Sequence, residues 1–252
     1  MTRRIPSAIN SEDLAGRPRL PSRRTWLLLV ALSFFSCGGT VASRRTFPLV
    51  VSPAGGALVT DSGWTVTLTS ARASLGAARF YSGKVPSIAR RTPRINPLEW
   101  LVSSAWAHPG HYVPGEAMGE LLRPLEVDLL QAETAWGEVS GVTGAYGSME
   151  VTVAAGGVRL AGTATKDTQT VSFDTGAFTP PAAIQAIVFE HQMDTSSGRV
   201  RLTVDLRTIV SRMDFAQVGA GANPLDSTSP AFNGFARGVE DSSAWRGTWE
   251  AP

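Results

Sequence analysis

Cysteine is nearly absent from this 252-residue chain, which contains only Cys37. A single cysteine excludes an intramolecular disulfide and a metal site built from several thiolates. Stability must therefore come from an ordinary apolar core, and hydrophobic residues make up 43% of the chain.

The chain also lacks the short motifs that mark several enzyme classes. It has no G-x-S-x-G elbow, no H-E-x-x-H pair, no P-loop and no dinucleotide fingerprint. No two carboxylates are paired convincingly for hydrolysis. The sequence therefore favours a protein that is not an enzyme. A metal-dependent hydrolase remains an alternative, which would need three protein ligands and an open coordination position.

The apolar run near the N-terminus is too short to span a membrane. Residues 26–35 provide ten apolar or small residues, whereas a spanning helix needs roughly 20. Arg23 and Arg24 precede the run and small residues follow it, which is the pattern of a secretory signal. We expect a signal peptide over residues 1–36, a tether over 37–46 and one domain over 47–252.

The end of this signal, Phe34-Phe35-Ser36-Cys37, resembles the lipobox of bacterial lipoproteins. In that family the cysteine is lipidated and becomes the first residue. Phe34 replaces the usual Leu, and Phe35 is larger than the usual residue. The resemblance implies an exported protein anchored to a membrane through Cys37. Gly38 in place of Asp implies the outer membrane, with the protein facing the periplasm or the surface. The alternative is an ordinary cleaved signal with an incidental cysteine.

Residues 22–28 also resemble a twin-arginine export signal, with Trp26 where Phe is common. That route carries proteins that have already folded. The strongly apolar run that follows, with no basic residue before Cys37, fits ordinary secretion better.

The positive net charge belongs to the leader. Without residues 1–36 the chain has 17 basic and 19 acidic residues. Nucleic acid is therefore not an expected partner, because its recognition begins with a basic stripe. The partners implied are the membrane, through the lipid anchor, and an unidentified envelope protein or metal donor or acceptor.

The body of the chain has the pattern of β-strands. Trp64, Val66 and Leu68 alternate with threonines, and period-2 alternation is the strand signal. Similar short segments recur between glycine-rich turns, which predicts an all-β fold, an antiparallel β-sandwich or a barrel-like single domain. Ser229 and Pro230 are suited to begin one short C-terminal helix over 231–239. The expected strands are 47–51, 63–72, 73–81, 125–130, 134–142, 149–153, 158–164, 169–173, 184–190, 199–206, 209–215 and 243–250, with turns at 155–157, 166–167 and 196–198.

Two of the three histidines flank a Pro-Gly pair. In the stretch His108-Pro109-Gly110-His111, Pro and Gly favour a type II turn, which brings its first and fourth Cα atoms within about 7 Å. The imidazoles of His108 and His111 can then converge on one point. Neutral imidazole is the commonest side-chain metal ligand. The sequence therefore predicts a metal-binding loop, and the alternative is a polar surface loop whose Pro-Gly pairs only set turns.

Further ligands are needed to complete such a site. Val113-Pro114-Gly115-Glu116 repeats the turn pattern and could supply the Glu116 carboxylate, with Glu120 or His191 as a fourth ligand. A short helix over 114–122 would place Glu116 and Glu120 on one face. Two imidazoles and a carboxylate suit Zn or Cu, and also Fe(II).

Aromatic residues flank the histidine stretch. Trp100, Trp106 and Tyr112 lie close to it in the sequence and are the residues that we expect beside a bound ligand. Trp64, Trp245 and Trp249 occupy alternating strand positions and are expected in the core. The leading interpretation is a lipid-anchored metal-binding protein for delivery or sensing. The alternative is a β-sandwich binding or structural module of the cell envelope without a metal.

Overall fold

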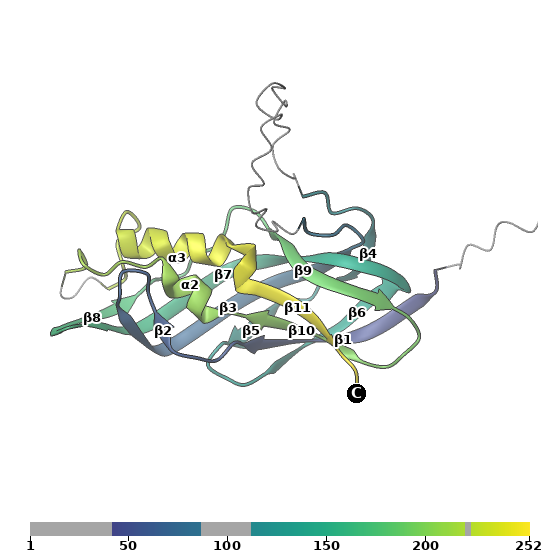
Figure 1. Ribbon diagram of the computed structural model, residues 1–252, viewed down its shortest axis with the longest axis horizontal. Helices are drawn as coiled ribbons and strands as arrows, with labels where there is room; N and C mark the ends of the chain where they lie inside the picture. Colours follow the sequence, from purple (N-terminus) through teal and green to yellow (C-terminus); the bar gives the residue numbers. More distant parts are fainter. Residues whose placement is uncertain (1–41, 87–111, 220–222) are drawn as a thin grey trace, which may run out of the picture. The chain divides into compact units, whose positions relative to one another are not determined.

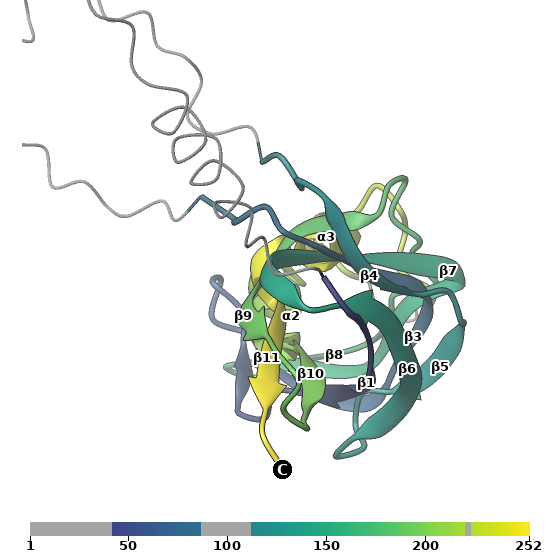
Figure 2. The same ribbon diagram turned by 90° about the vertical axis from the view of Figure 1, so that its right-hand side faces the viewer.

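Eight strands of this protein close into a ring in which every strand pairs with two neighbours. The computed structural model describes residues 42–86, 112–219 and 223–252. Around the ring the order is β3, β4, β6, β1, β10, β11, β9 and β7, and β7 pairs with β3 again (Figures 1 and 2). The strands are β1 (Arg44–Pro53), β2 (Leu58–Val59), β3 (Thr65–Tyr81), β4 (Ala117–Leu121), β5 (Leu125–Asp128), β6 (Thr134–Val142), β7 (Gly144–Lys166), β8 (Gln169–Asp174), β9 (Ile184–Met193), β10 (Arg199–Val204) and β11 (Trp245–Glu250).

The predicted all-β class is confirmed, and the sheet is mixed rather than wholly antiparallel. β1 runs parallel to β10, and β11 runs parallel to β9. The second pairing arises because β11, the last strand, lies between β9 and β10. The predicted turn at 196–198 therefore joins two strands that are not neighbours in the sheet. β1 begins at Arg44, so the last residues assigned to the tether are already paired with β6.

Two pairs of predicted strands are single long strands. Residues 65–81 form β3 without interruption, and residues 144–166 form β7. The expected turn at 155–157 is a bulge inside β7. Between the pairs Ala73–Val158 and Leu75–Val153, β7 has four residues where β3 has only Ser74. Gly157, with φ of +65°, permits this irregularity without ending the strand.

The strand predicted over 209–215 is wrong, because its first residues belong to helix α2 (Leu206–Ser211). Asp205 caps the helix by accepting a hydrogen bond from the Arg207 backbone N–H at 2.9 Å. Leu206, Ile209 and Val210 are buried at helical spacing. The apolar residues that suggested a strand therefore form the buried side of a helix.

The predicted C-terminal helix is confirmed as α3 (Pro230–Glu240), with Ser229 as its N-cap. Its two glycines weaken the helix in isolation, but they bring it against α2. A side chain on Gly234 would strike the Arg212 carbonyl, and one on Gly238 would strike the Ile209 carbonyl. A 3-10 turn, η2 (Ser242–Ala244), then leads into β11. In the described ranges, no helix has the length and apolar character needed to cross a membrane.

Aromatic side chains fill the interior of the ring. Phe47, Phe80, Tyr146 and Phe189 pack edge to face with ring centroids 5.3–6.1 Å apart. Such pairs add to the stabilisation from burial alone. Trp64 and Trp245 are fully buried, and Trp249 packs partly buried against the same core, so these predicted core residues are confirmed.

Candidate functional site

The two chain segments that bracket residues 87–111 are hydrogen-bonded to each other. The Gly83 N–H donates to the Pro114 carbonyl at 2.7 Å, and the Ser82 N–H donates to the Glu116 carbonyl at 3.0 Å. The Glu116 N–H donates to the Ser82 hydroxyl at 3.0 Å. We call residues 82–86 and 112–116 the two arms. They hold the ends of the histidine-containing segment together, while His108, His111, Trp100 and Trp106 lie outside the described residues.

The arms lie directly on the outer backbone of β7. A side chain at position 147, where the protein has glycine, would strike the carbonyl oxygens of Ser82 and Gly83. A side chain at Gly83 would likewise meet Pro114 of the other arm. Gly115 has φ of +76° and lies against Gly83. That φ suits the third position of a type II turn. Residues 112–115 are nevertheless not assigned to a hydrogen-bonded turn.

A buried serine fixes both arms to β7. The Ser148 hydroxyl donates to the Gly83 carbonyl at 2.5 Å and lies 2.7 Å from the Tyr112 hydroxyl. Because a serine hydroxyl has one proton, Tyr112 must be the donor to Ser148. Burial is the main reason that the pKa of Tyr112 is raised, which keeps this hydroxyl protonated. We call Gly83, Tyr112 and Ser148 the arm anchor.

A charged row lies beside the arm anchor on the outer face. Glu150 is 8% exposed and pairs with Arg79, its Oε1 lying 3.1 Å from Nη1. The Gln185 amide donates to the other Glu150 oxygen at 3.3 Å. The pKa of Tyr81 is raised, mainly by burial and secondly by the negative charge of Glu150. The Glu150 carboxylate is therefore paired and hydrogen-bonded within this row.

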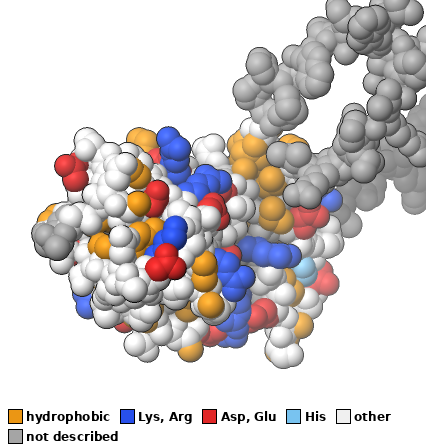
Figure 3. Space-filling model, turned by 60° about the vertical axis from the view of Figure 1, so that its left-hand side comes forward, with side chains coloured by type: hydrophobic (Ala, Val, Ile, Leu, Met, Phe, Trp, Pro, Cys, Tyr) orange, Lys and Arg blue, Asp and Glu red, His pale blue; other side chains and the backbone are white. Residues whose placement is uncertain are grey.

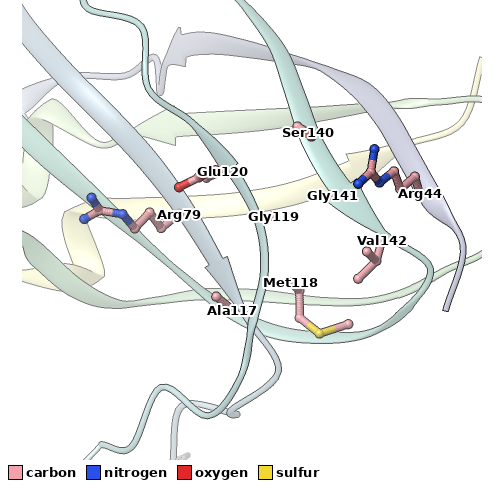
Figure 4. Close-up of a pocket in the computed structure, with 9 residues that line it drawn as sticks. All are labelled: Arg44, Arg79, Ala117, Met118, Gly119, Glu120, Ser140, Gly141 and Val142. Carbon is pink, nitrogen blue, oxygen red and sulfur yellow. The ribbon is translucent and has the colours of Figure 1, made fainter.

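A shallow outer groove adjoins this row above the junction of β4 and β6 (Figure 4). Its floor is the facing pair Gly119 and Gly141. Beneath that pair the buried Tyr146 hydroxyl lies 2.8 Å from the carbonyl oxygens of both Met118 and Val142, so it fills the junction from inside. The lining residues are Arg44, Arg79, Ala117, Met118, Gly119, Glu120, Ser140, Gly141 and Val142. With one carboxylate and no imidazole, this groove is not suited to hold a transition metal.

The structure separates the predicted ligands that it describes. Glu116 belongs to the second arm. Glu120 lies on β4, which is a strand and not the helix considered from the sequence, and it pairs across the sheet with Arg79. Along an extended chain the four residues from Glu116 to Glu120 span about 13 Å. Glu116 and Glu120 therefore do not lie one turn apart on a helix face, as the sequence suggested.

His191 lies at the inner side of the ring. Its ring stacks on Trp249 with centroids 4.7 Å apart and an interplanar angle of 14°. It lies two residues from each of the buried Phe189 and Met193 and so shares their inward face of β9, whereas Glu120 is adjacent to the buried Leu121 on β4 and so faces outward. Among the described residues the buried His191 Nε2 atom has no hydrogen-bond partner, and desolvation lowers the pKa of His191. His191 and Glu120 therefore cannot ligate the same ion.

Another charge cluster, which lies on β10, β11 and the turn before β6, is also self-contained. Glu133 and Glu250 each pair with both Arg199 and Arg201, at 2.5–2.8 Å. Acidic and basic side chains are interspersed on the face shown in Figure 3. Over the described residues, no three His, Cys, Asp or Glu side chains are grouped to hold a metal.

Sequence reasoning missed the arm anchor. Ser148 is one of many serines, and its role depends on a contact with Gly83, 65 residues away. One signal was available in Gly147, which lies between Tyr146 and Ser148 inside β7. A glycine inside a strand often marks the close approach of another backbone.

Comparison with known proteins provides no relative to guide the assignment. No protein-family model, curated protein or solved structure matches the chain.

Proposed function

We propose that this protein is an exported, lipid-anchored protein that binds a divalent transition metal, Zn or Cu, through His108 and His111 for delivery or sensing. The observation that supports the proposal is the pairing of the two arms. Gly83 bonds to Pro114, and Ser148 fixes both arms to the closed sheet. A loop whose ends are fixed loses less conformational entropy when its ligands converge on an ion.

Glu116 is the described carboxylate that fits this proposal best. It belongs to the second arm, five residues after His111, and its backbone is fixed by Ser82. We leave Glu120 and His191 out of the proposed set, because Glu120 lies about 13 Å along the extended chain from Glu116 and the His191 ring stacks on Trp249. The proposed ligand set is therefore His108, His111 and Glu116, with the remaining positions open to water or to a partner protein.

Metal analysis of protein purified without a histidine tag tests the proposal. We expect one equivalent of Zn or Cu per chain, lost in the variant His108→Ala/His111→Ala. His191→Ala is the matched control, because it removes the third histidine and should retain the metal. Glu116→Gln should weaken binding about tenfold or more, as expected for loss of a ligand or its support, whereas Glu120→Gln should not. Absence of a bound metal, and of a thermal shift with Zn, Cu or Ni, would refute the proposal.

The lipid anchor has a separate test. Cys37→Ala should release the protein from membranes into the soluble fraction, and metal binding should persist because Cys37 is not among the proposed ligands. Cys37→Ser serves as the conservative companion variant and should behave in the same way. Fractionation of the wild-type protein as fully soluble would contradict the anchor and leave the metal proposal standing.

A further inference from the structure

A groove of about 640 Å³ opens between β2, the middle of β3 and the turn after β5. None of the residues that line it carries a charge. Its apolar lining consists mainly of Leu58, Val66, Leu68, Leu129, Leu130 and Leu206. This volume lies in the usual range for sites that bind small molecules.

The groove exists because β3 changes partners along one edge. β7 pairs with one edge of β3 along nearly its whole length. On the other edge β2 pairs with Thr65 and Val66, and β5 pairs with residues 72–75. The strands of the described ranges leave residues 67–70 unpaired on that edge. Apolar side chains that would otherwise lie inside a continuous sheet therefore border an opening.

A cation lies at the rim of this groove. Gly56 is part of the lining, and a side chain there would collide with the Arg207 guanidinium, which lies against it. Arg207 is exposed and forms no ion pair with the residues described. The Asp205 carboxylate, two residues away, instead accepts hydrogen bonds from the Arg207 N–H at 2.9 Å and from the Thr208 hydroxyl at 3.0 Å.

We propose that this groove binds a single-chain lipid with an anionic head group, a fatty acid. The alkyl chain lies among the leucines, and the carboxylate meets the guanidinium of Arg207. An uncharged, largely apolar lining with the Arg207 guanidinium at its rim is complementary to an amphiphile of this kind. Leu130 at the rim is 45% exposed, and the bound alkyl chain would cover this apolar surface.

Titration calorimetry of the full-length protein with dodecanoate, below its micelle concentration, tests the proposal. We expect saturable binding that weakens roughly fourfold for each methylene removed from the chain, the usual effect of burying one fewer methylene. Dodecyltrimethylammonium has the same chain and the opposite charge, and it should bind at least tenfold more weakly. Failure of dodecanoate to saturate, or equal affinity for the two detergents, would overturn the proposal.

Two variants on the surface locate the site. Arg207→Gln should weaken dodecanoate binding about tenfold, and Leu130→Asp should weaken it at least as much. Both residues are exposed, so the fold should persist, and circular dichroism checks this. Leu122→Asp and Arg246→Gln are matched controls, because both residues are exposed and neither lines the groove. Equal losses in variants and controls would show that binding is nonspecific and overturn the proposal. If Leu130→Asp fails to fold, the dodecanoate affinity of Arg207→Gln alone tests the proposal.

Discussion

The long pair of strands β3 and β7 supports two chemically different surfaces at its two ends. At the C-terminal end of β3 the outer face holds the arm anchor, where Tyr112 and Ser148 form hydrogen bonds and Glu150 pairs with Arg79. At the N-terminal end, the edge of β3 borders a groove without a charged residue. One end holds another segment by polar contacts, and the other leaves apolar surface open. The same β-ladder can therefore hold a loop at one end and leave a ligand groove at the other.

Adding one methyl group at each end should give the largest contrast. Gly147→Ala places a methyl group against the backbone of the arms, which cannot move aside without breaking the arm anchor. We expect a loss of about 1–3 kcal/mol in the free energy of unfolding, as for overpacked sites. Gly55→Ala in the groove meets no atom within 4 Å and should leave stability nearly unchanged. Urea denaturation measures both, and equal effects would show that the arms do not rest on β7.

Removing the buried hydroxyl of the arm anchor should have the next largest effect. Ser148→Ala leaves the Gly83 carbonyl and the Tyr112 hydroxyl without their partner, which should cost about 1–3 kcal/mol. The matched control is Ser140→Ala, at an exposed position on the same outer face. Hydrogen exchange at the Gly83 amide should accelerate in the first variant and not in the second. Unchanged protection at Gly83 would show that the arms are held by something other than Ser148.

Alkaline pH should weaken the arm anchor, because Tyr112 loses its proton there. Its pKa is raised in the folded protein, so the folded state retains a proton that the unfolded state loses above about pH 10. The contribution of Tyr112 to stability is therefore complete below that pH and is lost as pH rises through the folded pKa. Tyr112→Phe should reduce the fall in stability between pH 9 and 11, measured by denaturant titration. A variant that falls as steeply as the wild type would contradict this assignment.

Mild acid should produce the smallest effect, through His191. Burial lowers its pKa, so the unfolded state binds the proton more readily. The contribution of neutral His191 is present above the unfolded pKa of about 6.5 and is lost as pH falls through the folded value. His191→Gln should make stability less dependent on pH between 7 and 5. A steeper dependence in the variant would indicate that the imidazole gains a partner when it is protonated.

Local patterns predicted most of the strands because alternation is a property of neighbouring residues. The segment 134–142 matches β6, and Ser229 begins α3 as its sequence suggests. The errors lie where a distant contact decides the outcome. Residues 155–157 were predicted as a turn because of their glycines. Pairing with β3 continues on both sides of them, so they form a bulge within β7. The apolar residues of α2 read as a strand because their helical spacing covers fewer than two turns.

The candidate site was less accessible to sequence reasoning. The sequence suggested Glu116, Glu120 and His191 as ligands from residue type and local spacing, because register and facing cannot be known before the sheet is known. Closure of the ring sends Glu120 outward and His191 inward. The paired arms depend on residues 82–83 meeting 114–116, and no local pattern reports a contact over that separation.

The position of β11 has a consequence for how the protein is made. Residues 245–250 are synthesised after every other strand, yet they lie between β9 and β10. Until they emerge, both neighbouring edges remain unpaired, and such edges are prone to wrong association. The ring can therefore close only after β11 has emerged from the ribosome. A chaperone that shields β9 and β10 during that interval would raise the yield, and a chain lacking these residues should aggregate.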